Sequence, residues 1–433
     1  MDNKREIFGW SMYDWANSAF STTVATTFLG PYLDTLAKAQ GGTVNFLGLQ
    51  IEGAAFFPFC VSISVILQVL FLPILGTIAD YSNLKKPMML LFAYTGAAAT
   101  LLLFLVQGNL IVLGGFLFIL ANLAFGAAIV FYNAFLPDIA NPDRRDSVSS
   151  QGFAFGYIGG GVLLLLNLIL INWMEDKALA VRISLASAGI WWLVFTYLFP
   201  QQRLIQREPA QSLPEGESYL AHSLKQLKIT LKELWQKYPK TLRYLVAYLI
   251  YNDGIQTVIV VSTLFAAGEL GIPIQTLVLV VLMIQFVASG GAFIFNLLAG
   301  RIGAKNSIMF NLVIWVGLLI YAYGFLFTTA QFWVLGALVA LVLGGSQALS
   351  RSLFSQMIPE NREAEYFSFY EISERGTSWI GPAVFGLAVQ ITGTQRIAIL
   401  SLIIFFAVGL VLLYFTNVKQ AITDVGNEVP AVI

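Results

Sequence analysis

The feature that most constrains this chain is a succession of about twelve apolar segments, each roughly 18 to 26 residues long. An α-helix rises 1.5 Å per residue, so a segment of this length can cross a hydrocarbon core of about 30 Å. Of the 433 residues, 58% are hydrophobic and 11% are charged, whereas a soluble domain carries about 25% charged residues. We therefore expect an all-α membrane protein with twelve transmembrane helices. Their predicted bounds are 10–33, 53–78, 87–107, 109–135, 150–174, 178–199, 243–267, 273–299, 306–328, 331–357, 369–392 and 395–417.

The basic residues predict how the chain is oriented in the membrane. If both termini lie on one side, all of the 24 Lys and Arg residues fall on that side except Lys38, Lys177, Arg182 and Arg396. Cytoplasmic loops are enriched in Lys and Arg, so we expect both termini in the cytoplasm.

The only long polar stretch lies between the sixth and seventh spans and divides six spans from six. It predicts an N-terminal bundle at 1–199, a cytoplasmic linker at 200–242 and a C-terminal bundle at 243–433. Within the linker, leucines recur at helical spacing from Leu220, with lysines on other faces, which predicts an amphipathic helix on the inner leaflet. The alternative is a helix packed on the protein's own cytoplasmic loops.

Two pairs of similar stretches indicate that the halves arose by duplication. "LPDIANPDRRDSVSSQGFAFGYIGG" aligns without a gap on "IPENREAEYFSFYEISERGTSWIGP", and "GTIADYSNLKK" after the second span is similar to "NLLAGRIGAK" after the eighth. Repeated bundles around a site near the bilayer midplane are an architecture of secondary transporters. The predicted fold is therefore two six-helix bundles related by pseudo-two-fold symmetry.

"GTIADYSNLKK" resembles the loop between helices two and three of the major facilitator superfamily. In that loop Gly76 permits close helix approach, and Asp80 can accept hydrogen bonds from a neighbouring helix. The resemblance implies the major facilitator fold and a latch on the inward-closed state. Gly300 stands where an acid would fall in the second-half loop, so we expect the first latch to dominate.

Four further stretches resemble the vacuole effluxer family, known from fungal autophagy and from bacterial permeases: "GWSMYDWANSAFSTTV", "FYNAFLPDIA", "SVSSQGFAFGYIGG" and "SQALSRSLFSQMIPENREAEYFSFYEISERGTSWIGP". For fungal members of this family, the resemblance implies export of amino acids from the vacuole. Bacterial relatives need not share that substrate. The expected location is the inner membrane of a bacterial cell.

The first span carries Asp14 and several neutral polar residues along one face. An unsatisfied polar group in hydrocarbon costs several kcal/mol, so this face is expected to meet a solute path, with bonding between helices as the alternative. The seventh span carries a similar polar face. In the superfamily that the chain resembles, the first, fourth, seventh and tenth helices line the cavity. The candidate solute-binding residues are Asn17, Ser18, Ser21, Asn122, Asn133, Tyr251, Asn252, Gln256, Gln347 and Arg351.

A group of charges in "YEISERGTSW" shares one face of the eleventh span. Charges inside a membrane are expensive, so Glu371, Glu374 and Arg375 should pair or meet water. They could relay protons, grip a zwitterion or form a cytoplasmic gate. Since His222 lies in the linker, a proton carrier in the membrane must be a carboxylate.

Asp14 and Asp253 have no basic residue within a turn on their own helices, so we expect either to titrate, while Glu371 and Glu374 set the closed state. The candidate coupling or gating residues are Asp14, Asp80, Asp253, Glu371, Glu374 and Arg375.

The sequence argues against an enzyme. His222 is the only histidine, which excludes a histidine-based triad inside the membrane, and no phosphate-binding G-x-x-x-x-G-K-[ST] loop occurs. We expect no cofactor, no metal site and no nucleic-acid partner. The main interpretation is a monomeric secondary active or facilitative transporter that exports a small polar solute, most simply an amino acid, by alternating access, with protons as the candidate coupling ion. Alternatives are a drug or metabolite exporter and a non-transporting scramblase or receptor.

Overall fold

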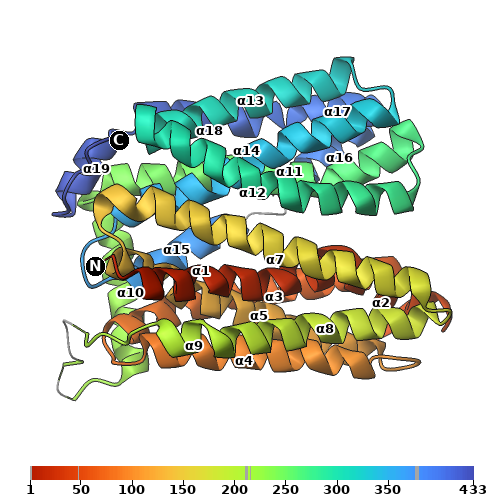
Figure 1. Cartoon of the computed structure of the whole chain (residues 1–433), viewed down its shortest axis with the longest axis horizontal. Coiled ribbons are helices and arrows are strands. Elements are labelled where there is room, and N and C mark those ends of the chain that lie inside the picture. Colours follow the sequence, from red (N-terminus) through yellow and green to blue (C-terminus); the bar gives the residue numbers. More distant parts are fainter. Residues whose placement is uncertain (1, 47, 210–212, 215, 376–379) are drawn as a thin grey trace.

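The computed structural model describes residues 2–46, 48–209, 213–214, 216–375 and 380–433. Its described residues are almost entirely helical, and the long helices run side by side (Figure 1). Both chain ends lie at the same end of the molecule, on the left in Figure 1, which we call the terminal end.

The first part of the chain forms α1 (Lys4–Ala19), the π-helix η1 (Phe20–Phe28), α2 (Leu29–Lys38), α3 (Gly53–Asp80), α4 (Lys85–Leu102), η2 (Leu103–Leu105), α5 (Ile111–Ala134), α6 (Leu136–Ile139), η3 (Pro142–Arg144), α7 (Arg145–Trp173), α8 (Lys177–Leu198) and α9 (Pro200–Arg203). The second part forms α10 (Tyr219–Gln236), α11 (Pro239–Leu270), α12 (Ile274–Ile302), α13 (Ala304–Gly324), α14 (Thr329–Gln356), α15 (Glu363–Arg375), α16 (Ile380–Thr392), α17 (Gln395–Ser401), α18 (Ile403–Phe415) and α19 (Val418–Asp424). A short antiparallel hairpin, β1 (Thr43–Phe46) with β2 (Leu49–Glu52), departs from the all-α prediction.

Within the described residues, ten helical segments are long and apolar enough to cross a membrane. Two further predicted spans are broken. The first, predicted at 10–33, runs as α1, η1 and α2 over 4–38. The eleventh, predicted at 369–392, consists of α15 and α16 on either side of 376–379, which lie outside the described residues. The helices found are therefore consistent with twelve spans.

The π-helix η1 changes the phase of the first span. Thr26 Oγ1 donates to the Ser21 carbonyl at 2.8 Å, and Thr27 Oγ1 to the Thr22 carbonyl at 2.7 Å, each five residues back. A π-helical segment advances fewer degrees per residue than an α-helix. The predicted polar face therefore does not continue in a straight line past residue 20.

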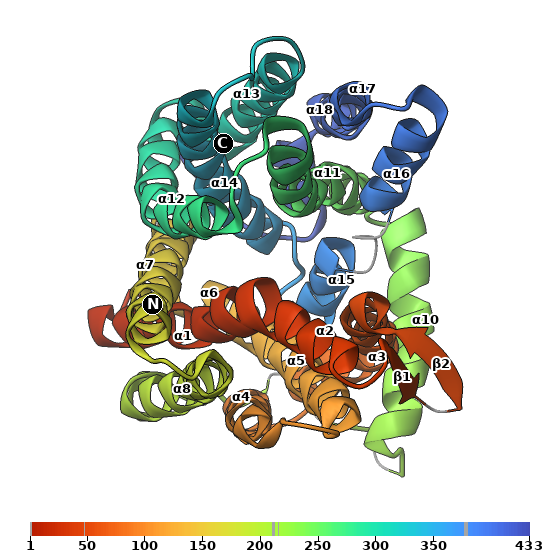
Figure 2. The same cartoon turned by 90° about the vertical axis from the view of Figure 1, so that its right-hand side faces the viewer.

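Figure 2 looks along the spanning helices and shows two groups. Helices α1–α8 form the first helix group, and α11–α18 form the second, with α15 lying between the two. Helix α10 runs across the spanning helices at the outer edge of the molecule. The domain bounds 1–199, 200–242 and 243–433 stay a prediction.

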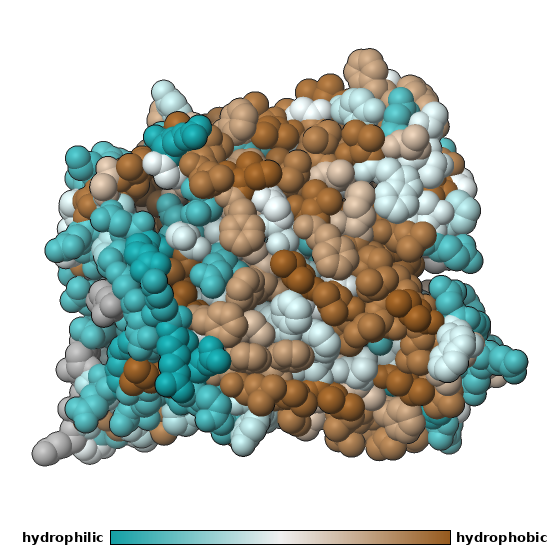
Figure 3. Space-filling model, in the orientation of Figure 1, coloured by the Kyte–Doolittle hydropathy of each residue, from teal (hydrophilic) through white to brown (hydrophobic). Residues whose placement is uncertain are grey.

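The outer surface is apolar along the middle of the molecule. Brown, hydrophobic residues cover the central band in Figure 3, and hydrophilic residues collect at the terminal end. Large apolar side chains of the spanning helices are well exposed, including Ile66, Leu297 and Ile391. An apolar surface of this extent is not stable in water, so the helices are placed in a bilayer.

Candidate gate between the two helix groups

Hydrogen bonds between the two helix groups gather toward the terminal end. Among the described residues, those within the spanning helices join α3, α5 and α7 of the first group, with Asp14 of α1, to α14 and α15 of the second. Along the α7 and α14 seam, the bond farthest from the terminal end runs from the Tyr157 hydroxyl to Gln347 Oε1. The terminal end is thus the side on which the groups are fastened together.

Arg351 of α14 lies at the centre of this contact. It is 3% exposed, and its Nη1 lies 3.2 Å from Oδ2 of Asp14 on α1. The same carboxylate oxygen accepts a hydrogen bond from the Tyr132 hydroxyl at 2.6 Å. Arg351 also donates from Nε to Ser149 Oγ at 2.9 Å and from Nη2 to the Ser149 carbonyl at 2.8 Å. Every partner named here belongs to the first group.

Aromatic rings enclose the Arg351 guanidinium. Its central carbon lies 4.1 Å from the ring centroid of Phe153, 4.8 Å from that of Trp10 and 5.5 Å from that of Tyr132. A cation over an aromatic face is attracted to the ring, and the attraction is stronger away from water. A Cβ on Gly152 would lie 2.6 Å from Asp14 Oδ2 and 2.9 Å from Arg351 Nη2. The glycine run of α7 therefore provides the space for the pair.

A second charged pair lies beside the first. Glu371 accepts from Arg375 Nε at 3.2 Å and from Asn133 Nδ2 at 2.9 Å. Asn133 also accepts from Arg351 Nη1 at 3.4 Å, so its amide joins the two pairs. The sequence placed Glu371 and Arg375 together, and the structure does the same. It adds that α5 of the first group contacts them.

Asp14 has no basic residue within a turn on α1, as the sequence showed, and the expectation that it titrates stays a prediction. That expectation considered only the helix that carries Asp14, whereas Arg351 comes from the opposite helix group. Asp14 is thus placed as a partner in the contact between groups. Asp253, the other predicted titrating residue, accepts the Gly381 N–H at 2.8 Å and makes no ion pair within the described part of the chain.

Asp80 fastens the first group to the start of α15. Its two carboxylate oxygens accept the backbone N–H groups of Ala364 at 3.0 Å and Glu365 at 2.8 Å. These are first-turn donors that have no partner within their own helix, and the helix dipole favours an anion there. A Cβ on Gly76 would lie 2.5 Å from the Ala364 carbonyl oxygen, so only glycine permits this approach.

A polar seam along α7 and α14 extends the contact to the end of both helices. Arg145 donates to the Ser355 carbonyl at 2.7 Å and to Gln356 Oε1 at 3.2 Å. Ser352 Oγ donates to Asp146, and Ser149 Oγ donates to the Ala348 carbonyl at 2.7 Å. Separation of the two groups at this end would break all of these bonds together.

Other predicted solute-binding residues lie farther from the terminal end. Asn17 of α1 is buried, and its Nδ2 has no hydrogen-bond partner among the described residues. Ser18 lies beside Gly156 of α7, and Ser21 Oγ donates to the Ser18 carbonyl at 3.1 Å.

On the second group, two of the predicted residues form hydrogen bonds within that group, and a third lies farther along α11. Tyr251 forms a hydrogen bond with Ser350 Oγ at 2.6 Å, and Asn252 Nδ2 donates to the Glu374 carbonyl at 2.9 Å. Gln256, one turn farther along α11, is partly buried. Tyr251 and Asn252 are therefore engaged with their own group in this state.

Asn122, a predicted solute-binding residue, forms its hydrogen bonds within the first group, and its contact with solute stays a prediction. Its Nδ2 donates to Ser64 Oγ at 2.7 Å, and its backbone carbonyl accepts from Gln68 Nε2 at 2.7 Å. Both partners lie on α3 of the same helix group, so Asn122 bonds helices within the first group. A polar residue in a membrane helix can serve either purpose, and its sequence position does not distinguish them.

The sequence pattern did not reveal the aromatic residues around Arg351 or the contribution of Arg145 and Ser149. Trp10 and Tyr132 lie in the stretches that carried the family resemblance, and Ser149 begins "SSQGFAFG". The signal that could have found them was the concentration of aromatic residues and arginines in those stretches. Their pairing could not be inferred, because the residues are far apart in the chain.

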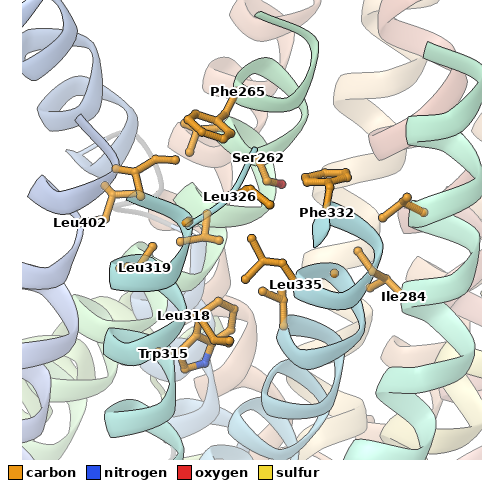
Figure 4. A pocket seen from close by; sticks show the side chains of 17 residues that line it. Ser262, Phe265, Ile284, Trp315, Leu318, Leu319, Leu326, Phe332, Leu335 and Leu402 are labelled. Atoms are coloured by element: carbon orange, nitrogen blue, oxygen red, sulfur yellow. The ribbon is translucent and has the colours of Figure 1, made fainter. Parts of the chain in front are cut away.

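An apolar cavity lies within the second group, between α11, α12, α13, α14 and α17 (Figure 4). Phe265, Trp315, Leu335 and Phe332 line it, with Ser262 as a polar contributor. None of the predicted solute-binding or gating residues lines this cavity. In the part of the chain that the structure describes, no cluster of three or more His, Cys, Asp or Glu side chains could hold a metal ion.

Comparison with known proteins gives relatives along the whole chain. A family model described as vacuole effluxer Atg22 like matches residues 2–426. An uncharacterized MFS-type transporter, YxiO, of Bacillus subtilis (strain 168) is 34% identical, over 97% of this chain and 96% of its own length. Autophagy-related protein 22-1 of Penicillium rubens is 25% identical, over 98% of this chain and 91% of its own length.

A solved structure has the same fold. The crystal structure of FucP, a major facilitator superfamily transporter in the outward conformation, superposes with a TM-score of 0.66 at 13% identity, over 96% of this chain and 99% of that chain. The fold is therefore the major facilitator fold, as the sequence predicted, and the relatives are transporters of that kind.

Proposed function

The chain belongs to the Atg22-like vacuole effluxer family, and we propose that it carries a small polar solute across the membrane by alternating access. In this proposal the bundles 1–199 and 243–433 rock against each other, and the linker 200–242 connects them. The observation that carries the proposal is the buried Asp14 and Arg351 ion pair between the helix groups. A buried ion pair adds little net stability compared with apolar packing, which favours a contact that forms and breaks during a cycle.

We propose an amino acid as the solute. An α-amino acid carries a carboxylate and an ammonium group on one carbon, and Arg351 and Glu371 present the opposite charges near each other through Asn133. A zwitterion could therefore compete for both partners of the gate. The family description as effluxers supports export. The neutral groups proposed to hold the solute beyond the gate are Asn17, Ser18, Ser21, Asn252, Gln256 and Gln347.

The test is solute-dependent stabilisation of the purified protein, screened over amino acids, sugars, nucleosides and organic anions. At least one amino acid should raise the unfolding temperature, and Arg351→Ala should remove the shift. Arg396→Ala, outside the gate on α17, is the matched control and should keep it. If only a sugar or a nucleoside stabilises the protein, the amino-acid proposal is wrong.

Individual neutral contacts should have smaller effects. A neutral hydrogen bond is worth about 0.5 to 1.5 kcal/mol, so alanine at Asn17 or Gln256 should weaken solute binding roughly two- to tenfold. Asn122→Ala, within the first group, should leave the affinity unchanged if the variant folds. Equal affinity in the Asn17 and Gln256 variants would place the solute elsewhere.

We propose that any proton coupling uses Asp253 rather than Asp14. Asp14 is held by Arg351, whereas Asp253 makes no ion pair within the described part of the chain. Asp253→Asn should abolish acid-driven accumulation in liposomes while exchange of solute continues. Accumulation that persists in this variant would exclude Asp253 as the proton carrier.

We further propose that the terminal end faces the cytoplasm of a bacterium and that the protein acts as a monomer. The distribution of Lys and Arg supports this orientation. In a Cys60→Ser background, Gln420→Cys on α19 should react with a membrane-impermeant maleimide only after the cells are opened. Labelling of intact cells at this position would reverse the orientation.

A drug or metabolite exporter is the second candidate, because the cavity in the second group is apolar. An apolar solute would bind there without the gate residues. The two candidates separate in one experiment, since Leu335→Trp should fill the cavity and block an apolar solute while leaving an amino acid bound.

A further inference from the structure

Helix α10 has an unusual distribution of side chains. The face turned toward the protein is mostly polar and buried, and it includes His222, Ser223, Gln226 and Thr230. The outer face carries an apolar stripe of Leu220, Leu224, Leu231 and Trp235, and Trp235 is 75% exposed. A helix on the surface of a soluble protein has the opposite arrangement.

A row of lysines borders the apolar stripe. Lys225, Lys228 and Lys232 are exposed and lie next to the stripe at helical spacing. Lys225 is paired with Glu217 at 2.9 Å, whereas no described acid forms an ion pair with Lys228 or Lys232. The helix therefore presents an apolar stripe edged by positive charge.

The position of α10 brings this surface to the edge of the bilayer. Figure 1 shows the helix at the terminal end, and Figure 2 shows it at the periphery of the molecule, lying across the direction of the spanning helices. A peripheral helix in this orientation lies along the membrane surface. In the part of the chain that the structure describes, no segment covers the apolar stripe.

The buried face of α10 holds the start of α15. Thr230 Oγ1 donates to the Glu365 carboxylate, and Arg362 pairs with Glu365 at 3.0 Å and with Glu233. The backbone N–H of Glu365 is also one of the two donors to Asp80. Whatever fixes α10 at the membrane therefore also fixes the helix end to which the first group is fastened.

We propose that α10 docks on an anionic phospholipid surface, with its apolar stripe in the acyl boundary and Lys228 and Lys232 on the headgroups, and thereby favours closure of the terminal end. Apolar burial supplies the attachment, and the lysines supply the preference for anionic lipid. The docking rests on the membrane location alone, and the effect on closure rests also on the proposed function.

Docking is tested with the full-length chain in nanodiscs, in a Cys60→Ser background. A bimane probe on Leu231→Cys should be quenched strongly by spin-labelled phospholipid. The matched probe on Gln236→Cys, about 140° away around the helix, should be quenched weakly. Equal quenching at both positions, or none at either, would overturn the proposal.

The lipid preference is tested by varying the phosphatidylglycerol fraction in phosphatidylcholine discs. Each lysine should raise the equilibrium constant for docking of α10 on the anionic surface roughly fivefold. Lys228→Gln combined with Lys232→Gln should lose this preference, and the control pair Lys4→Gln with Lys419→Gln, at exposed sites on α1 and α19, should keep it. Retention of the full preference in the α10 variant would contradict the role of these lysines.

Closure is measured separately by the distance between nitroxides on Arg5→Cys and Gln420→Cys at the terminal end. Removal of phosphatidylglycerol should increase the open fraction of the wild-type protein and should not change that of the α10 lysine variant. An open fraction that ignores the lipid in both proteins, with stripe quenching intact, would refute the effect on closure while the docking stands.

Discussion

The loops that follow α3 and α12 occupy equivalent places in the two helix groups, yet they fasten the groups in different ways. After α3, the Asp80 carboxylate accepts two backbone N–H groups at the start of α15. An acceptor with a full charge meets unpaired first-turn donors and the positive end of a helix dipole. This contact joins the two groups directly.

After α12 there is no acid. A Cβ added to Gly300 would meet no described atom within 4 Å, and Gly303, at φ +85°, lies against the backbone of Ile433. The C-terminal segment then reaches the other group, since the Ala431 N–H donates to Asp143 Oδ1 at 2.7 Å. This bond is exposed, so water screens it. The second loop is thus joined to the first helix group only indirectly, through the C-terminal segment and a weaker hydrogen bond.

In this molecule, two loops at equivalent places therefore join the helix groups by different contacts. The first loop is expected to control the opening of the terminal end, as its acid suggested from sequence. The nitroxide pair on Arg5→Cys and Gln420→Cys reports the ratio of open to closed molecules, on which the two loops can be compared.

The largest effect in this comparison is expected from Asp80→Ala. Hydrogen bonds to a charged group contribute about 1.5 to 3 kcal/mol, so the open-to-closed ratio should rise roughly ten- to hundredfold. Asp34→Ala, far from the gate on α2, serves as the control. A change of less than about twofold in the Asp80 variant would remove the first loop from the gate.

A smaller effect is expected from Asp143→Ala. This change removes the carboxylate acceptor for Ala431. Because the bond is exposed to water, it should contribute no more than an ordinary hydrogen bond, about 0.5 to 1.5 kcal/mol net. The open-to-closed ratio should rise roughly two- to tenfold. A larger rise than that of Asp80→Ala would reverse the comparison.

The smallest effect is expected from Gly300→Asp. The site has free space, but among the described residues no partner lies within 4 Å of a Cβ there. A surface substitution of this kind changes stability by about 0.5 kcal/mol or less, so the ratio should stay within about twofold. Strong closure by the new acid would mean that the second loop had lacked only the charge.

The helices could be predicted closely from sequence because hydrophobicity is a local property. The predicted span 53–78 is found as Gly53–Asp80, and 178–199 as Lys177–Leu198. The first span was harder, because the π-helix η1 changes the angular spacing after residue 20. A prediction at 100° per residue could not include that change.

The gate could be predicted only in part. Glu371 and Arg375 lie four residues apart on one helix, so periodicity placed them together. Asp14 and Arg351 are separated by 337 residues, and no local pattern states which helix faces face each other. The enclosure of Arg351 by Trp10 and Phe153 is likewise a product of helix packing, and it needed the structure.

We propose that Asp14 and Arg351 form a contact that opens during transport. The most direct measurement is a double-mutant cycle on the open-to-closed ratio, with Asp14→Ala, Arg351→Ala and the combined variant. Removal of one partner of a buried ion pair costs about 3 to 5 kcal/mol, so each single variant should shift the ratio at least a hundredfold toward open. The combined variant should shift it by clearly less than the product of the two single shifts. Purely multiplicative shifts, or single variants that remain closed, would show that this ion pair does not hold the terminal end closed.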